Sequence, residues 1–177
     1  MIGLLISFTT LIIFLILSVK IIISLIKKKP FPKRLLFVML FGIVLVSSIY
    51  VYEVYFFTFN NIDKKFMQNG PGPVLSPTGA YTANAYFEPY GGAAGGVNMW
   101  VEITMHHDHD NNKIIYYSDA NDNVLLDWAD KKTLFITNAG PYNNSIKLDV
   151  EHEIYHDRGL ACRSWLMKGE YVTCYQE

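Results

Sequence analysis

Two histidines four positions apart, in the stretch HEIYHDRG at residues 152–159, are the residues with the clearest chemical potential. In zinc proteases a pair with this spacing lies on a helix and binds one Zn²⁺, while the glutamate between them acts on the metal-bound water. His152 and His156 would be the zinc ligands and Glu153 the catalytic residue. The pattern therefore defines one hypothesis, a zinc metallohydrolase.

The flanking sequence favours a structural role for the same residues. The preceding stretch IKLDV alternates apolar and polar residues, which is typical of a strand. A helix from Asp149 to Gly159 would have about two and a half turns, too few to fix a rigid pair of ligands. We therefore expect a strand or turn over residues 150–158, no catalytic residue and no metal cofactor. The zinc hypothesis requires a helix there.

A second group of histidines lies in MHHDHDNN, residues 105–112. Imidazole is a preferred donor for Zn²⁺, Cu²⁺ and Ni²⁺, so this group defines another alternative, a non-catalytic metal-binding protein. That alternative requires His106 and His109 to approach each other or His152. A solvated polar turn rich in Asp and Asn is the competing interpretation.

Two long apolar segments precede all of these residues. They cover about residues 2–26 and 35–57, and each is long enough to cross a bilayer as a helix. The loop between them, residues 27–34, is short and carries five positive charges: Lys27, Lys28, Lys29, Lys33 and Arg34. Short basic loops remain in the cytoplasm. Residues 1–59 thus predict a transmembrane hairpin in a multi-pass protein of the cell membrane, with the lipid bilayer as a partner and the C-terminal domain outside.

The chain after residue 59 is acidic, with nine basic and fifteen acidic residues and hence a net charge of −6. This charge argues against nucleic acid as a partner. It is compatible with a basic protein partner in the cell envelope.

The outer part divides into a linker and a β-rich domain. Residues 60–73 are polar and end in Gly-Pro-Gly-Pro, which predicts a linker. Apolar and polar residues alternate within residues 74–177, as in Val97–Met105, and Asn- and Asp-rich turns separate the shorter runs. The predicted fold class is two N-terminal transmembrane helices plus a small, mainly β extracytoplasmic domain, built as an antiparallel sheet, a sandwich or a barrel. Trp100, Trp128 and Trp165 either pack on its sheets or line a ligand groove.

Both cysteines lie in the last part of the chain. If residues 167–169 form a hairpin loop, Cys162 faces Cys174 across two antiparallel strands. The pair is a candidate disulfide because both residues are expected outside the cytoplasm. Two buried thiols remain the alternative.

Three stretches of the domain form a recognisable series: SPTGAY at 76–81, LDWADKKTLFITN at 126–138 and YHDR at 155–158. They resemble a family of short, membrane-anchored extracytoplasmic proteins of Gram-positive bacteria that has no established activity. The family pattern has S-P-x-G-x-Y, W-x-D before a strand, and Y-D-x-R. This chain departs from it at His156 and in the cysteine-bearing tail. The resemblance covers roughly residues 74–158 and implies a membrane-anchored domain of unknown function.

These observations together predict a membrane-anchored extracytoplasmic module that binds, senses or assists without catalysis. A membrane-tethered zinc metallohydrolase and a non-catalytic metal-binding protein are the alternatives.

Overall fold

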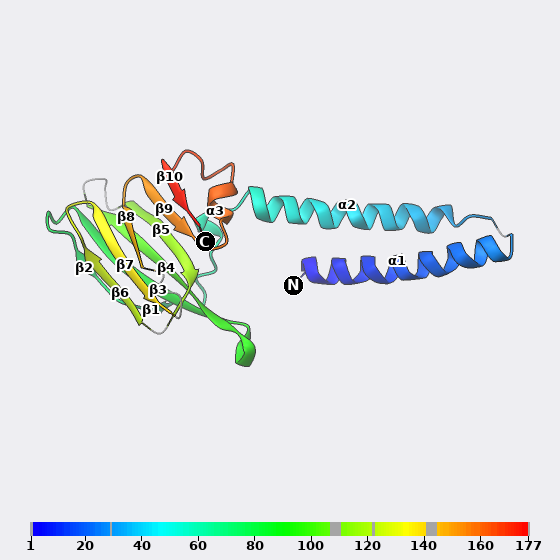
Figure 1. The fold of residues 1–177 in the computed structure, drawn as a ribbon, viewed down its shortest axis with the longest axis horizontal. Helices are drawn as coiled ribbons and strands as arrows, with labels where there is room; N and C mark the ends of the chain where they lie inside the picture. The colour runs from blue at the N-terminus through cyan, green and yellow to red at the C-terminus, as the bar shows by residue number, and fades with distance from the viewer. Residues whose placement is uncertain (1, 29, 107–110, 122, 141–144, 177) are drawn as a thin grey trace. The chain divides into compact units, whose positions relative to one another are not determined.

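The computed structural model describes residues 2–28, 30–106, 111–121, 123–140 and 145–176 (Figure 1). The chain forms two compact units, residues 1–54 and 55–177. The first is helical and the second is mainly β, in agreement with the predicted fold class.

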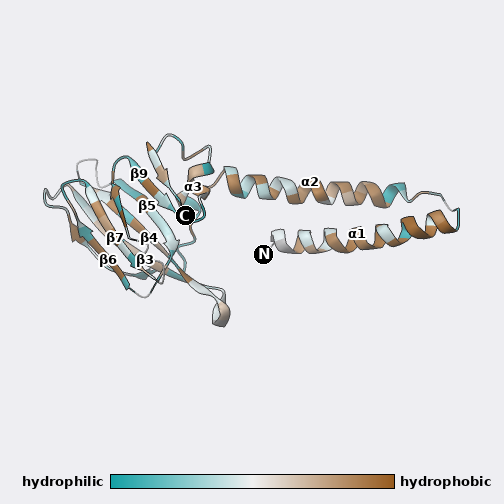
Figure 2. Cartoon of the chain, in the orientation of Figure 1, coloured by the Kyte–Doolittle hydropathy of each residue, from teal (hydrophilic) through white to brown (hydrophobic). Residues whose placement is uncertain are grey.

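The first unit contains two helices, α1 (Ile2–Ile26) and α2 (Lys33–Tyr55), whose last residue Tyr55 already belongs to the second unit. Both helices are long and apolar enough to cross a membrane, and Figure 2 shows hydrophobic residues along both. Helices suit this environment because every backbone polar group in their interior is satisfied within the segment. Lys33 and Arg34, expected in the loop, form the first turn of α2 after Pro32. Lys29 lies outside the described residues.

The larger of two sheets in the second unit has the strand order β1-β3-β4-β5-β9-β10, and β2 also pairs with β3. Its strands are β1 (Gln68–Asn69), β2 (Val74–Leu75), β3 (Tyr81–Tyr90), β4 (Gly96–Met105), β5 (Asn111–Asp119), β9 (Glu153–His156) and β10 (Thr173–Tyr175). The pairs up to β5 are antiparallel, whereas β5 with β9 and β9 with β10 are parallel. The sheet is therefore mixed, and it is not closed into a barrel.

A smaller antiparallel sheet has the order β6-β7-β8. Its strands are β6 (Asn123–Trp128), β7 (Thr133–Ala139) and β8 (Ile146–Asp149). Its buried side chains, Leu134, Ile136 and Leu148 among them, belong to the same core as Ala83, Val101 and Ile103 of the larger sheet. We call the face of the larger sheet that carries these residues its inner face.

Tyr81 links the two sheets through a polar contact at the edge of this core. Its hydroxyl donates a hydrogen bond to the carboxylate of Glu151, in the turn between β8 and β9. The Nζ of Lys132, from the β6–β7 turn, lies 2.6 Å from the other oxygen of that carboxylate. Burial, and then the hydrogen bond to Glu151, raises the pKa of Tyr81 to about 12. The phenol therefore keeps its proton more tightly in the folded chain.

Residues 60–73, predicted as a linker, contribute to the larger sheet and to the packing of the core. β1 pairs with β3, and the backbone N–H groups of Gly70 and Ala85 donate to the carbonyls of Ala85 and Pro71. Phe59, in the short helix η1 (Phe59–Asn61), is buried in the core, and Ile62 packs against it. The sequence did not predict this packing because the segment is mostly polar. A few apolar residues, such as Ile62, are enough to hold it against the core.

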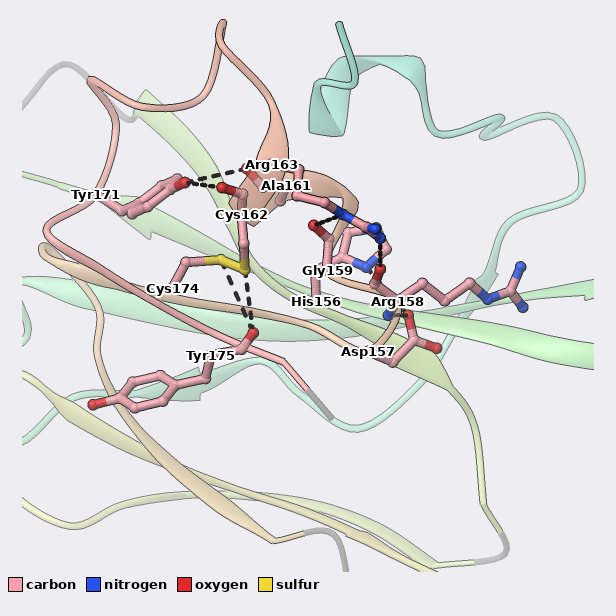
Figure 3. The surroundings of a disulfide bond; sticks show 10 residues. All are labelled: His156, Asp157, Arg158, Gly159, Ala161, Cys162, Arg163, Tyr171, Cys174 and Tyr175. Carbon is pink, nitrogen blue, oxygen red and sulfur yellow. Dashed lines mark hydrogen bonds and ion pairs between the residues drawn. A yellow bond between two sulfur atoms is a disulfide. The ribbon is translucent and has the colours of Figure 1, made fainter. Parts of the chain in front are cut away.

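The disulfide joins Cys162 and Cys174, but the predicted hairpin around it is wrong (Figure 3). Cys162 lies in the short helix α3 (Leu160–Arg163), and Cys174 lies in β10, which runs parallel to β9. The hydroxyl of Tyr171 bonds the carbonyls of Ala161 and Cys162, which closes the loop between the two cysteines. The bridge therefore ties a helix to an edge strand. A loop of this length gives about 3 kcal/mol in the chain-entropy model.

Tyr81→Phe should lower the free energy of unfolding of the second unit by about 1 to 2 kcal/mol near neutral pH, because a hydrogen bond to a carboxylate is lost. The raised pKa means that the stabilisation by Tyr81 is complete below about pH 10 and is lost as the pH rises towards 12. We expect the wild type to lose more stability than the variant over this interval. Denaturant unfolding of the detergent-solubilised full chain, followed by tryptophan fluorescence between pH 8 and 12, measures both profiles. Parallel profiles would contradict the proposed linkage.

Candidate functional site

The outer face of the larger sheet carries a row of four ring side chains on four adjacent strands. Cross-strand register pairs Tyr86 with Trp100, Trp100 with Tyr117 and Tyr117 with His156, so all four point to the same side. The ring centroids of Tyr86 and Trp100 are 5.9 Å apart, and those of Tyr117 and His156 are 5.0 Å apart. The alternation of apolar and polar residues in β4 predicts that only one face of the strand is buried. Both faces are buried here, because Trp100 on the outer face is as fully buried as Met99 and Val101 on the inner face.

The segment that follows α2 covers the His156 end of this row. The rings of Phe57 and Phe59 lie 4.9 Å and 6.3 Å from the imidazole of His156. Ser164, just after α3, is buried beside them, and its hydroxyl donates to the carbonyl of Phe57 at 2.6 Å. Residues 57–59 thus form a layer of the second unit over the outer face of its larger sheet.

His156 is completely buried in this layer. Neither of its ring nitrogens has a hydrogen-bond partner among the described residues, although Nδ1 lies 3.2 Å from a carboxylate oxygen of Asp157. Burial alone would raise the pKa of Asp157, but His156 and the backbone N–H of Arg158 outweigh it and hold that pKa below its usual value. The arrangement orients the imidazole within the layer.

The helix required by the zinc hypothesis is a strand, because residues 153–156 form β9 between β5 and β10. Over four residues an extended chain advances about 13 Å, far more than one turn of a helix. The side chain of His152 is exposed, whereas that of His156 is buried. The carboxylate of Glu153 accepts bonds from the backbone of Asp149 and the hydroxyl of Tyr175. These three side chains do not converge on one point.

Instead, His152 lies beside Asp149 and Glu151, with one donor atom of each within 4.8 Å of the others. A local turn accounts for this cluster, because a carboxylate oxygen of Asp149 accepts the backbone N–H groups of Glu151 and His152. In the described ranges this is the one group of three such donors. Of the second histidine group, His106 is placed with its Nε2 2.8 Å from the hydroxyl of Thr82. His109 lies outside the described residues.

A polar groove of about 570 Å³ lies on the same outer face. β4 and β5 line its floor, the segment after α2 forms one wall, and the loop after α3 forms another. Its lining residues are Thr58, Phe59, Asn60, Lys64, Glu102, Met105, Asn111, Asn112, Lys113, Ile114, Met167 and Glu170. Phe59 has two roles, since it lines the groove and also packs on His156.

Lys64, Glu102 and Lys113 of the groove have partners within the protein. The Nζ of Lys64 is 3.3 Å from the carboxylate of Glu102. The Nζ of Lys113 donates to the carbonyl oxygens of Glu151 and Glu170 at 3.0 and 2.8 Å. Burial lowers the pKa of Lys113, partly offset by the charges of Glu170, Asp149 and Glu151. The groove therefore combines amide groups with charged side chains of both signs, three of which already have partners.

The sequence predicted no ligand groove from these residues. Met105, Asn111 and Asn112 lie in the stretch that carries the second histidine group, and Asn60 and Lys64 lie in the predicted linker. The groove joins β4 and β5 to a segment near residue 58 and to a loop near residue 167, and no local pattern predicts that segments so far apart in sequence meet.

Comparison with known proteins gives one match, to a family model described as "Family of unknown function (DUF5412)", over residues 32–159. The matched part includes α2, the segment after it and the strands as far as β9, and it ends before α3. The curated proteins and the solved structures gave no match.

Phe59→Ala should destabilise the second unit by about 3 to 5 kcal/mol, because a buried ring is lost from the core. Phe66→Ala is the matched control: it removes the same ring a few residues later, where the side chain is 63% exposed. That change should stay within about 0.5 kcal/mol of the wild type. Denaturant unfolding of the full chain in detergent measures both. Equal effects would restore the linker interpretation of this segment.

Proposed function

This chain belongs to the family of unknown function DUF5412, and we propose that it is a membrane-anchored module that binds a polar ligand outside the cytoplasm, without catalysis. The two apolar helices would hold it in the bilayer, and the groove on the outer face of the larger sheet would take the ligand. The proposal assigns no metal or cofactor to the site. It extends to the setting that the sequence resemblance implies, the cell envelope of a Gram-positive bacterium.

One observation carries this proposal. Thr58, Phe59 and Asn60 line the groove, and they follow the end of α2 at Tyr55 by three to five residues. A ligand in the groove would touch the short stretch of chain that joins the β unit to its membrane anchor. This connection suits a sensing or accessory role, in which a ligand bound in the groove would alter the segment of chain that leads to the helices.

The basic loop between the helices supports the proposed side of the membrane. Lys27, Lys28, Lys33 and Arg34 lie at or beside this loop, and such charges remain cytoplasmic. An outer location also suits the disulfide, which persists in oxidising compartments. The net charge of −6 after residue 59 favours a protein partner in the envelope over nucleic acid.

The lining of the groove indicates the class of ligand. Its three asparagines, Asn60, Asn111 and Asn112, offer both donors and acceptors. Lys64 and Glu102 neutralise each other, so neither sign of charge dominates. Phe59, Met105 and Ile114 add apolar surface. We propose a neutral ligand with hydroxyl and amide groups, such as an N-acetylated oligosaccharide.

A C-terminal fusion to alkaline phosphatase, which is active only outside the cytoplasm, should be active in bacterial cells. The matched fusion to a fluorescent protein that fails to mature when exported should be dark. Both results are expected because the basic loop between the helices stays on the cytoplasmic side of the membrane. A dark phosphatase fusion with a bright fluorescent one would overturn the proposed location.

Titration of the full chain in lipid nanodiscs with a tetramer of N-acetylglucosamine should show saturable heat. Asn112→Leu should weaken this binding at least tenfold, equivalent to about 1.4 kcal/mol, because amide hydrogen bonds are lost from the floor of the groove. Asn123→Leu is the matched control, since Asn123 is an equally exposed strand residue of the smaller sheet. No saturable heat, or equal weakening by both changes, would contradict this assignment of the groove.

A further inference from the structure

The loop after α3 exposes two consecutive apolar side chains. Trp165 is 58% exposed and Leu166 is 55% exposed, whereas their neighbours Ser164 and Met167 are buried. The loop is fixed and not frayed, because the hydroxyl of Ser164 bonds both the carbonyl of Phe57 and the backbone N–H of Leu166. A fixed loop that presents a tryptophan and a leucine to its surroundings requires an explanation.

Contacts within the β unit hold this loop against the residue where α2 ends. The backbone N–H of Trp165 donates to the carbonyl of Tyr55 at 2.9 Å. The indole ring lies 5.3 Å from the ring of Tyr55 and 5.5 Å from that of Phe56. Because Tyr55 is the last residue of α2, Trp165 contacts the chain at the point where that helix ends.

The side chains of the loop have the chemistry of a membrane interface. Tryptophan and tyrosine concentrate at the headgroup level, where an apolar ring and a polar N–H or O–H are both accommodated. Arg163 and Lys168 flank the apolar pair and are exposed. Cations so placed attract anionic headgroups. Aromatic, aliphatic and basic side chains thus follow one another over six residues.

We propose that Trp165 and Leu166 insert into the interfacial layer of the same bilayer that α2 crosses, so that the β unit has a second contact with lipid. The partner is the lipid surface, because chain continuity through Tyr55 brings that surface to the loop. The inference rests on α2 spanning a membrane. It is independent of the groove and of which side the β unit occupies.

Quenching of tryptophan fluorescence by brominated lipids tests the proposal. The full chain is reconstituted into phosphatidylcholine and phosphatidylglycerol vesicles whose acyl chains carry bromine near the headgroups. Emission should fall relative to unbrominated vesicles, and this loss should vanish in Trp165→Phe. Phenylalanine keeps a ring beside Tyr55, and the backbone hydrogen bond to Tyr55 is unaffected, so this variant should fold.

A second variant provides the matched control. Leu125→Trp combined with Trp165→Phe places a tryptophan on β6 of the smaller sheet, at a position that is also 55% exposed. Its emission should not be quenched. Equal quenching of the wild type and Trp165→Phe would overturn the proposal. Quenching of the control would also overturn it, because the whole second unit would then adhere to the lipid surface without preference for the loop after α3. Full access of Trp165 to aqueous acrylamide would overturn it as well, because the loop would then be a surface for a protein partner.

Discussion

The larger sheet buries side chains on both of its faces, and the rest of the second unit follows from the need to cover them. The smaller sheet covers the inner face, where Tyr116 and Tyr155 stack with centroids 4.9 Å apart. On the outer face, the segment after α2 covers the end of the ring row at His156. A sheet buried on one side only would leave this row in water. The segment after α2 is therefore a structural layer of the second unit, which begins at the end of α2.

The groove lies beside the segment that covers the outer face of the larger sheet. Here Phe59 contributes to the wall and also packs on His156, so the wall cannot move without disturbing buried contacts. The strand β9 that carries His156 is tied to α3 through the turn at Gly159 and through the disulfide. In the function proposed above, a ligand in the groove would therefore contact a residue that packs on the buried His156.

Much of this architecture was predictable from the sequence, and the failures have a common cause. Length and hydropathy identified both helices, and alternation identified the strands β3, β4 and β8, because these signals are local. The parallel pairing of β9 with β5 joins residues about 40 positions apart, so no local pattern predicts it. The same pairing places His156 on the outer face of the larger sheet, where Phe57 and Phe59 cover it. The groove was missed because its lining joins segments far apart in the sequence, whereas pairing the two cysteines needed only their count.

The stretch HEIYHDRG is explained by the strand without any chemistry of zinc. In β9, Tyr155 faces the inner core and stacks on Tyr116, while His156 faces outward beneath Phe57, so alternate residues serve opposite faces. Glu153 and Tyr175 bond each other across the parallel pair, and Asp157 bonds the backbone N–H of Asp119 on the neighbouring strand. Gly159, with a φ of 63°, then turns the chain into α3. These contacts account for the residue types of β9 and of the turn that follows it. The two histidines are four residues apart because His152 directly precedes β9 and His156 is its last residue.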